Sequence, residues 1–357
     1  MKVRSAVERI LTNFAISFLS WIEFLKKEKQ FGLKSVSFKK IKLILKGFYS
    51  IGQVPFNFSK FDYSDFISDL ENIRLSYLNY PYGRLLRDKL LFSIYFKNFC
   101  NVPEIYAYLN RGYIHSITNE HPNMNFDLLL KILENNAIIT KPRFGTGGKD
   151  ITKIERKSEN EFLLNNQIFS KEKLQNWILT RDDFIIVKYI KQSTFSEKFF
   201  DNSANTIRIT TYVNPESKEG KILYALMRFG TNRSAPADNV GAGGVYALID
   251  IESGQLGKAI ELLDLGKYRH LDIHPESKVP IENVYIPGWG ELKNDFIKLS
   301  SLLSPYIKFA GWDIILTDDS YYLIEGNNGP DLYIQGPDNP LAISKDIKAF
   351  LKNYNIR

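Results

Sequence analysis

The feature that most constrains the fold is a change of sequence pattern at residue 137. Before this point the chain has mostly helical patterns. After it come seven short runs rich in β-branched and aromatic residues, each bounded by Gly, Asn, Asp or Pro. The runs are AIITKPRF, DFIIVKYI, TIRITTYV, KILYALMRFG, GGVYALIDI, GWDIILT and YYLIEGN. Helical stretches separate some of them and close the chain. This pattern predicts an α+β fold with mainly antiparallel sheets, preceded by a helical region.

A chain of 357 residues is too long for one small core and predicts two or three packed subdomains. We expect a basic helical N-terminal region over residues 1–60, with a break near Gly32. A second region over 61–136 is also expected to be largely helical. Residues 137–195 and 196–357 are then expected to form two strand-rich subdomains.

The positive charge of the chain is concentrated at the N-terminus. Residues 1–50 hold eleven Lys and Arg against three Glu, a net charge of +8, whereas the whole chain carries +7. The remaining residues therefore sum to −1. A nucleic-acid-binding protein would spread basic residues among aromatic ones across a binding face, so this class is disfavoured. The single cysteine, Cys100, excludes a disulfide within the chain and favours a reducing compartment such as the cytoplasm.

The N-terminal stretch ILTNFAISFLSWIEFL is apolar but interrupted by polar residues, and it is shorter than the roughly 20 residues that span a bilayer. No small-residue cleavage site follows it, which disfavours a signal peptide. As a helix it has one broad apolar face, expected to pack on the rest of the protein. The alternative is peripheral contact of residues 1–50 with an anionic membrane, with Trp21 and Phe24 entering the interface and nearby lysines meeting lipid phosphates.

The most informative stretch is GWDIILTDDSYYLIEGNNGP, in which two apolar runs flank a polar turn at residues 318–320. If these three residues form the loop, Thr317 pairs with Tyr321. Asp313 then lies opposite Glu325 on the neighbouring strand. The stretch therefore predicts a hairpin with two acidic side chains facing each other.

Alternation of side chains in this register places Asp313, Glu325 and Asn327 on one face, which Leu323 shares. Two carboxylates opposite each other repel, and a divalent cation resolves the conflict. Because all three groups offer oxygen, the set suits Mg²⁺ rather than zinc. A slip of one residue would instead place Asp313 opposite Gly326. The alternative interpretation is an exposed hairpin with solvated carboxylates.

A second motif, IITKPRFGTGGKDIT, places Lys141 at the end of an apolar run before a glycine-rich loop. Glycines allow backbone N–H groups to approach phosphate oxygens, and a lysine adds positive charge to the same phosphates. The glycines concerned are Gly145, Gly147 and Gly148. A plain turn between two strands is the alternative interpretation of this motif.

In order along the chain, these pieces resemble the ATP-grasp superfamily. RDKLLFSIYFKNFCNVPEIYAYL is similar to its lysine-bearing segment, with Lys89 at the lysine, and KPRFGTGGKDI is similar to its second lysine and phosphate-covering loop. DDFIIVKYI is similar to the strand and hinge that hold adenine. The resemblance is closest to the sugar-transfer-associated ATP-grasp family. It rests also on NTIRITTYV, MRFGTNRSAPADNVGAGGVYALIDIESGQLG and HPESKVPIENVYIPGW, and it covers residues 85–335.

The resemblance implies two α+β subdomains that clamp ATP. Lys89 and Lys141 would bind its α- and β-phosphates, and Mg²⁺ would link the phosphates to the predicted metal ligands. The hinge residues Val187, Lys188 and Ile190 would hold adenine.

The resemblance also implies roles around the transferring phosphate and the ribose. Either Arg208 or Arg228 would stabilise the transferring phosphoryl group, although each is equally compatible with a surface ion pair. Asn239, in the loop DNVGAGG, would contact a substrate. An acid that binds ribose is implied shortly after the hinge, where Thr194 stands, with Glu197 following.

The function implied is a ligase that joins a sugar acid to an amino acid or small amine during surface polysaccharide biosynthesis, through an acyl phosphate. One alternative is a kinase that phosphorylates a sugar hydroxyl in the same cleft. Another is a nucleotide-binding accessory protein at the membrane that does not turn over.

Overall fold

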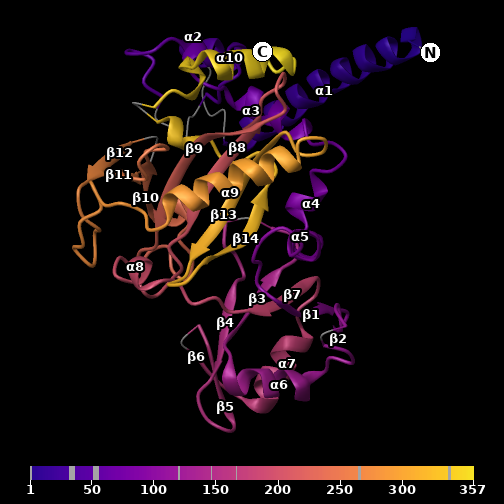
Figure 1. The fold of residues 1–357 in the computed structure, drawn as a ribbon, viewed down its shortest axis with the longest axis vertical. Coiled ribbons are helices and arrows are strands. Elements are labelled where there is room, and N and C mark those ends of the chain that lie inside the picture. Colours follow the sequence, from indigo (N-terminus) through magenta and orange to yellow (C-terminus); the bar gives the residue numbers. More distant parts are fainter. Residues whose placement is uncertain are drawn as a thin grey trace.

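The computed structural model describes residues 2–31, 37–50, 56–119, 121–145, 147–165, 167–263, 267–336 and 339–357, with side chains described except at 2–14, 31 and 333. Two seven-stranded antiparallel sheets dominate this part of the chain (Figure 1). The first has the order β2-β1-β7-β3-β4-β5-β6 and the second β12-β11-β10-β9-β8-β13-β14. The α+β class predicted from the sequence is therefore confirmed.

The first sheet is built from residues 105–188. Its strands are β1 (Ile105–Asn110), β2 (Tyr113–His115), β3 (Ile138–Pro142), β4 (Thr152–Arg156), β5 (Glu161–Leu164), β6 (Gln167–Ser170) and β7 (Phe184–Lys188). Helices α6 (Phe126–Asn135) and α7 (Lys171–Leu179) bury their apolar sides against it, Leu129 and Ile178 among them. Burial of this face gives the sheet its own hydrophobic core.

The second sheet is built from residues 207–327. Its strands are β8 (Ile207–Val213), β9 (Gly220–Phe229), β10 (Val245–Ile249), β11 (Leu256–Leu262), β12 (Tyr268–Leu271), β13 (Phe309–Leu316) and β14 (Tyr321–Asn327). Helix α9 (Trp289–Leu302) covers one face together with α5 (Lys89–Phe96). Helix α10 (Lys345–Asn353) and α3 (Asp69–Tyr77) cover part of the other. The uncovered part of that second face borders the site described below.

All seven strand runs predicted from the sequence form strands, as β3, β7, β8, β9, β10, β13 and β14. The region 61–136, expected to be largely helical, contains α3, α4 (Arg84–Arg87), α5 and α6, but it also supplies strands β1 and β2 of the first sheet. Helix α8 (Thr194–Glu197) follows β7. The boundaries predicted between subdomains stay predictions.

The N-terminal region contains α1 (Lys2–Phe31) and α2 (Phe38–Leu45), and the predicted break at Gly32 lies outside the described residues. Phe24 is fully buried, stacks on Tyr49 with ring centroids 4.9 Å apart, and packs with Trp21. The alternative in which Trp21 and Phe24 enter a membrane is therefore wrong, because Phe24 lies in the core of this region and Trp21 packs against it.

The hairpin of β13 and β14 differs from the predicted register next to its turn. Thr317 N–H donates to the Ser320 carbonyl at 2.9 Å, so the loop is one residue shorter than expected and Leu316, not Thr317, pairs with Tyr321. A β-bulge at Ile324 then restores the register.

Because of this bulge, Asp313 does lie opposite Glu325, as predicted. The bulge also reverses the alternation of faces. Leu323 packs in the apolar core, whereas Ile324 and Glu325 both line the cavity. The expectation that Leu323 shares a face with Glu325 is therefore wrong.

Gly326 is fixed by the packing of the helices on β14. A Cβ placed there would lie 2.7 Å from the Phe92 ring and 2.8 Å from Leu86. We predict that Gly326→Ala lowers the free energy of unfolding by about 1–3 kcal/mol, because the ring and the leucine must shift within a filled core. Urea unfolding measures this. Gly257→Ala on β11, with its nearest neighbour 3.8 Å away, is the control; equal losses in both variants would contradict the packing argument.

Candidate active site

A cavity of about 600 Å³ lies between the two sheets and is lined by residues of both. Twelve of the fourteen residues predicted for the site line it. They are Lys141, Gly147, Gly148, Val187, Lys188, Ile190, Arg208, Arg228, Asn239, Asp313, Glu325 and Asn327. The two sheets therefore bring together residues up to 186 positions apart in the sequence.

The other two predicted residues, Lys89 and Gly145, meet each other beside the cavity. The Lys89 ammonium donates to the Gly145 carbonyl at 2.7 Å and lies 3.5 Å from Glu325 Oε1. Lys89 is buried, although it is the first residue of α5. It thus links the glycine loop of the first sheet to the acidic strand of the second.

The position of Lys89 is set by its neighbour Asp88, which caps α5 by accepting from two backbone N–H groups. Arg143 holds the same carboxylate, with Nε 2.8 Å from Asp88 Oδ1. Burial acts to raise the pKa of Asp88, but its hydrogen bonds with Arg143 and the helix backbone outweigh this and lower it. The pair fixes α5 to the end of β3. No local sequence pattern predicts this pair, because its members lie 55 positions apart.

Lys141 at the end of β3 is buried and points across the cavity. Its Nζ lies 3.4 Å from the carbonyl of Ile324, the bulge residue of β14. Burial, with a smaller effect from Lys89, lowers the pKa of Lys141 to about 8, although Glu325 acts in the opposite direction. An anion that enters the cavity would stabilise the charged form of this lysine.

The glycine loop contacts a second loop from the other sheet. Gly147 and Gly148 both have positive φ, and a Cβ at Gly148 would lie 2.6 Å from Ala237. The Asn239 side-chain amide donates to the Gly147 carbonyl at 2.9 Å. The two loops therefore meet over one part of the cavity, and this close approach requires glycine at 148.

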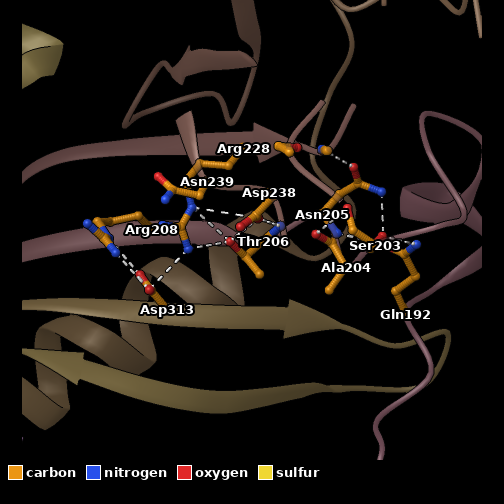
Figure 2. Close-up of polar contacts among 12 residues, drawn as sticks. Gln192, Ser203, Ala204, Asn205, Thr206, Arg208, Arg228, Asp238, Asn239 and Asp313 are labelled. Carbon is orange, nitrogen blue, oxygen red and sulfur yellow. Dashed lines mark hydrogen bonds and ion pairs between the residues drawn. The ribbon is translucent and has the colours of Figure 1, made fainter. Parts of the chain in front are cut away.

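At the other end of the cavity, Asp313 is held by two arginines (Figure 2). Arg208 binds it with two hydrogen bonds, at 2.6 and 2.7 Å, and Arg228 Nη2 lies 3.0 Å from Oδ2. The Arg208 and Asp313 side chains are each only 6% exposed. Burial acts to raise the pKa of Asp313, but the two guanidinium charges hold it well below its usual range.

Arg228 is shared with a second carboxylate. Its guanidinium donates to the Thr206 hydroxyl at 2.6 and 3.0 Å, and Nε lies 3.6 Å from Asp238. Asp238 also accepts from the Thr206 backbone at 2.8 Å. Figure 2 shows this chain of contacts from Asp313 to Asp238. Thr206, the residue before β8, was missed in the sequence because a threonine at the edge of a β-rich run carries no signal.

Glu325 and Asn327 offer oxygen donors beside Asp313, which suits the predicted magnesium. The Asn327 amide nitrogen is buried and finds no hydrogen-bond partner among the described residues, so the side chain is able to turn its oxygen to a ligand. In the described part of the chain, no three His, Cys, Asp or Glu side chains cluster as a metal site. Magnesium fits nonetheless, since it takes few protein ligands and completes its shell with phosphate and water oxygens.

The end of the cavity near β7 has both apolar walls and charged side chains, Lys153, Glu155 and Lys188 among them. Ile139, Leu163 and Val187 form walls there, as expected for a flat base such as adenine. The residues considered for ribose do not line the cavity. Thr194 binds Asp318 through its backbone and hydroxyl, and Glu197 pairs with a lysine. Asp201 and Asn202, which follow α8, line the cavity instead and went unrecognised in the sequence.

Three residues with chemically versatile side chains, His274, Trp289 and Cys100, do not line the cavity and have structural surroundings instead. His274 is fully buried, binds the Gly230 carbonyl at 2.9 Å, and has its pKa lowered by burial. Trp289 donates to the Ile251 carbonyl at 2.9 Å. Burial raises the pKa of Cys100 to about 12, which keeps its thiol protonated.

This two-sheet arrangement with lysines, glycine loop and acidic hairpin around one cavity is that of the ATP-grasp class. The chain belongs to the sugar-transfer-associated ATP-grasp family, which it matches over residues 71–348. This membership confirms the recognition made from the sequence motifs and places the chain among the ATP-grasp enzymes. A comparison with curated proteins found no match.

Solved structures show similarity at low identity. D-alanine–D-alanine ligase from Bacillus anthracis has 15% identity and a TM-score of 0.39, covering 79% of this chain and 69% of that chain. Its ATP complex has 13% identity and a TM-score of 0.40, covering 79% and 70%. The ATP-grasp ligase PsnB with its minimal precursor has 12% identity and a TM-score of 0.39, covering 76% and 62%. At these values the similarities say nothing of what this chain acts on.

The burial of Lys141 predicts that replacing this residue stabilises the fold but weakens nucleotide binding. We expect Lys141→Met to raise the free energy of unfolding by about 2–3 kcal/mol at pH 7, because it removes a buried charge whose pKa falls from 10.5 to about 8 on folding. The unfolded chain binds more protons between these values, so wild-type stability rises with pH there and the gain shrinks by pH 10. Urea unfolding at both pH values measures it.

The same variant should lose stabilisation by Mg·ATP, measured as the shift of Tm. Lys298→Met removes an exposed lysine and serves as the control, with neither property changed. Lower stability of Lys141→Met than of wild type at pH 7, or an unchanged response to Mg·ATP, would contradict the assignment.

Proposed function

We propose that this chain is an ATP- and magnesium-dependent ligase that joins a carboxylate to an amine through an acyl phosphate. The observation that carries this is the convergence of Lys89, Lys141 and the Asp313–Glu325–Asn327 set around one cavity between two sheets. The set combines positive charge for phosphates with oxygen donors for a cation, as phosphoryl transfer requires.

The substrate classes proposed follow from the family description, which is associated with sugar transfer. A sugar acid, free or in nucleotide- or lipid-linked form, would supply the carboxylate. An amino acid or small amine would supply the nucleophile. The setting would be biosynthesis of capsular or cell-wall polysaccharide in the cytoplasm.

In the first proposed step, a carboxylate oxygen of the sugar acid attacks the γ-phosphorus. The bond to the β-γ bridging oxygen breaks, and ADP leaves. Lys89 and Lys141 would hold the phosphates from the side of the first sheet, and the glycine loop would exclude water. Magnesium, held by Asp313, Glu325 and Asn327, would neutralise phosphate charge when bound. Positioning and charge neutralisation supply most of the catalysis in such a step.

In the second step, the amine attacks the acyl carbon. A C–N bond forms, the C–O bond to phosphate breaks, and the nitrogen loses a proton. Asn239 lies on the loop that meets the glycine loop, so we assign it to positioning of the acceptor. Its neighbour Asp238 accepts a hydrogen bond from the Thr206 backbone and lies near Arg228. These contacts would keep the loop next to the part of the cavity where we place the phosphates.

Of the two arginines, Arg228 is the better candidate for the transferring phosphoryl group. Arg208 uses Nε and Nη2 together to hold Asp313, which fixes the buried carboxylate. Arg228 makes a single, longer contact with Asp313, at 3.0 Å, and also contacts Thr206 and Asp238. A guanidinium shared in this way is able to turn toward a phosphate while Arg208 keeps Asp313 ionised.

Trapping with hydroxylamine tests the proposal. With Mg·ATP and a panel of uronic acids and their nucleotide-linked forms, we expect a hydroxamate, ADP and free phosphate, because only an acyl phosphate reacts in this way. Glu325→Gln should lower the rate by about 100-fold or more, since it removes an anionic oxygen ligand at the phosphates. Mass spectrometry and phosphate release measure both.

Asp319→Asn, at the exposed turn of the same hairpin, is the matched control and should keep the wild-type rate. A phosphorylated sugar without hydroxamate or free phosphate would favour a kinase instead. Equal activity of Glu325→Gln and wild type would remove Glu325 from the metal site.

A further inference from the structure

Helix α2 presents an apolar stripe to solvent. Phe38 is 86% exposed, Leu45 74% and Ile41 43%, and their spacing of three and four residues places them on one face. The other side of the helix is anchored, because Ile44 packs against the cluster that contains Phe24. The protein thus holds a short amphipathic helix with its apolar side outward, the reverse of what a core-facing helix does.

Exposed lysines accompany this stripe on α2 and at its C-cap. They are Lys39, Lys42 and Lys46. Figure 1 shows α2 and α10 at the same end of the molecule, away from the first sheet. Lys348 of α10 lies 3.7 Å from Asp65, so its charge is paired. The positive charge beside the exposed apolar side chains therefore comes from α2 and its C-cap.

We propose that α2 docks the protein on an anionic lipid bilayer. Phe38, Ile41 and Leu45 enter the interface between headgroups and acyl chains, and the surrounding lysines contact lipid phosphates. A protein partner would be expected to offer a groove and fixed acidic side chains. Protruding apolar residues ringed by long cationic side chains instead match a planar, anionic and fluid surface.

This contact is peripheral and independent of catalysis. None of the helices in the described part of the chain has the length and hydrophobicity of a transmembrane span. The docking residues also differ from the aromatic pair expected from the sequence, because Trp21 and Phe24 are packed beneath α2. The proposal therefore rests on the solvent exposure of Phe38, Ile41 and Leu45, which only the structure shows.

Sedimentation of the full chain with vesicles tests this proposal. We expect binding to phosphatidylcholine vesicles that contain phosphatidylglycerol, and binding about tenfold weaker or more to phosphatidylcholine alone. Raising the salt concentration should weaken binding to the anionic vesicles, because the lysine contacts are exposed and screened. No sedimentation with anionic vesicles at low salt would overturn the proposal.

Two variants distinguish docking through α2 from non-specific binding to the vesicles. Phe38→Ser with Leu45→Ser removes exposed apolar surface without touching the core, and it should weaken binding about tenfold while circular dichroism stays unchanged. Leu302→Ser is the matched control, because Leu302 is 61% exposed at the end of α9. Unchanged binding by the α2 variant, or an equal loss in Leu302→Ser, would overturn the proposal.

Lys39→Glu with Lys46→Glu tests the electrostatic part. Both lysines are exposed, so folding should be retained. The variant should lose its preference for anionic vesicles and sediment with both vesicle types equally. Retention of the full wild-type preference would show that these lysines do not contact the lipids and would overturn the docking geometry.

Discussion

The ion pairs of Arg208 and Arg228 with Asp313 allow one face of the second sheet to carry buried charges while its other face forms an apolar core. A carboxylate buried in the middle of β13 would cost several kcal/mol if left alone, and Arg208 and Arg228 compensate it from the two strands beyond. The opposite face of the same strand carries Trp312 and Ile314 in an apolar core under α9. One strand therefore separates a dry core from a charged cavity, and the charged side exists only because its groups neutralise one another.

The first sheet meets this charged side through a few directed contacts. Lys89 reaches Gly145 and Glu325, Lys141 reaches the bulge at Ile324, and Asn239 reaches Gly147. Each contact uses a group that phosphates would also attract. Entry of a nucleotide would replace contacts between the sheets by contacts to its phosphates, so the same residues both hold the two halves together and form the site.

Much of the fold and of the candidate site could be predicted from the sequence where the local pattern and the chemistry agreed. The seven strand runs were recognised because turn residues bound each β-branched run. The pairing of Asp313 with Glu325 was predicted correctly although the predicted loop was one residue too long. The bulge at Ile324 was not predictable, since it compensates a shorter turn and only the final register reveals it.

Other features depend on contacts distant in sequence. The Asp88–Arg143 pair joins residues 55 positions apart, and the bonds between Arg208 and Asp313 join residues 105 positions apart. Strands β5 and β6 escaped prediction because they are four residues long and partly exposed at a sheet edge. The orientation of α2 escaped for a related reason, because tertiary packing decides which side of an amphipathic helix is buried.

The most direct test of the account is a crystal structure with a non-hydrolysable ATP analogue and Mn²⁺, whose anomalous scattering locates the metal. We expect an anomalous peak bounded by Glu325, Asn327 and Asp313, with the phosphates between this peak and the two lysines. A nucleotide bound outside the cavity, or a metal peak away from these three side chains, would contradict it.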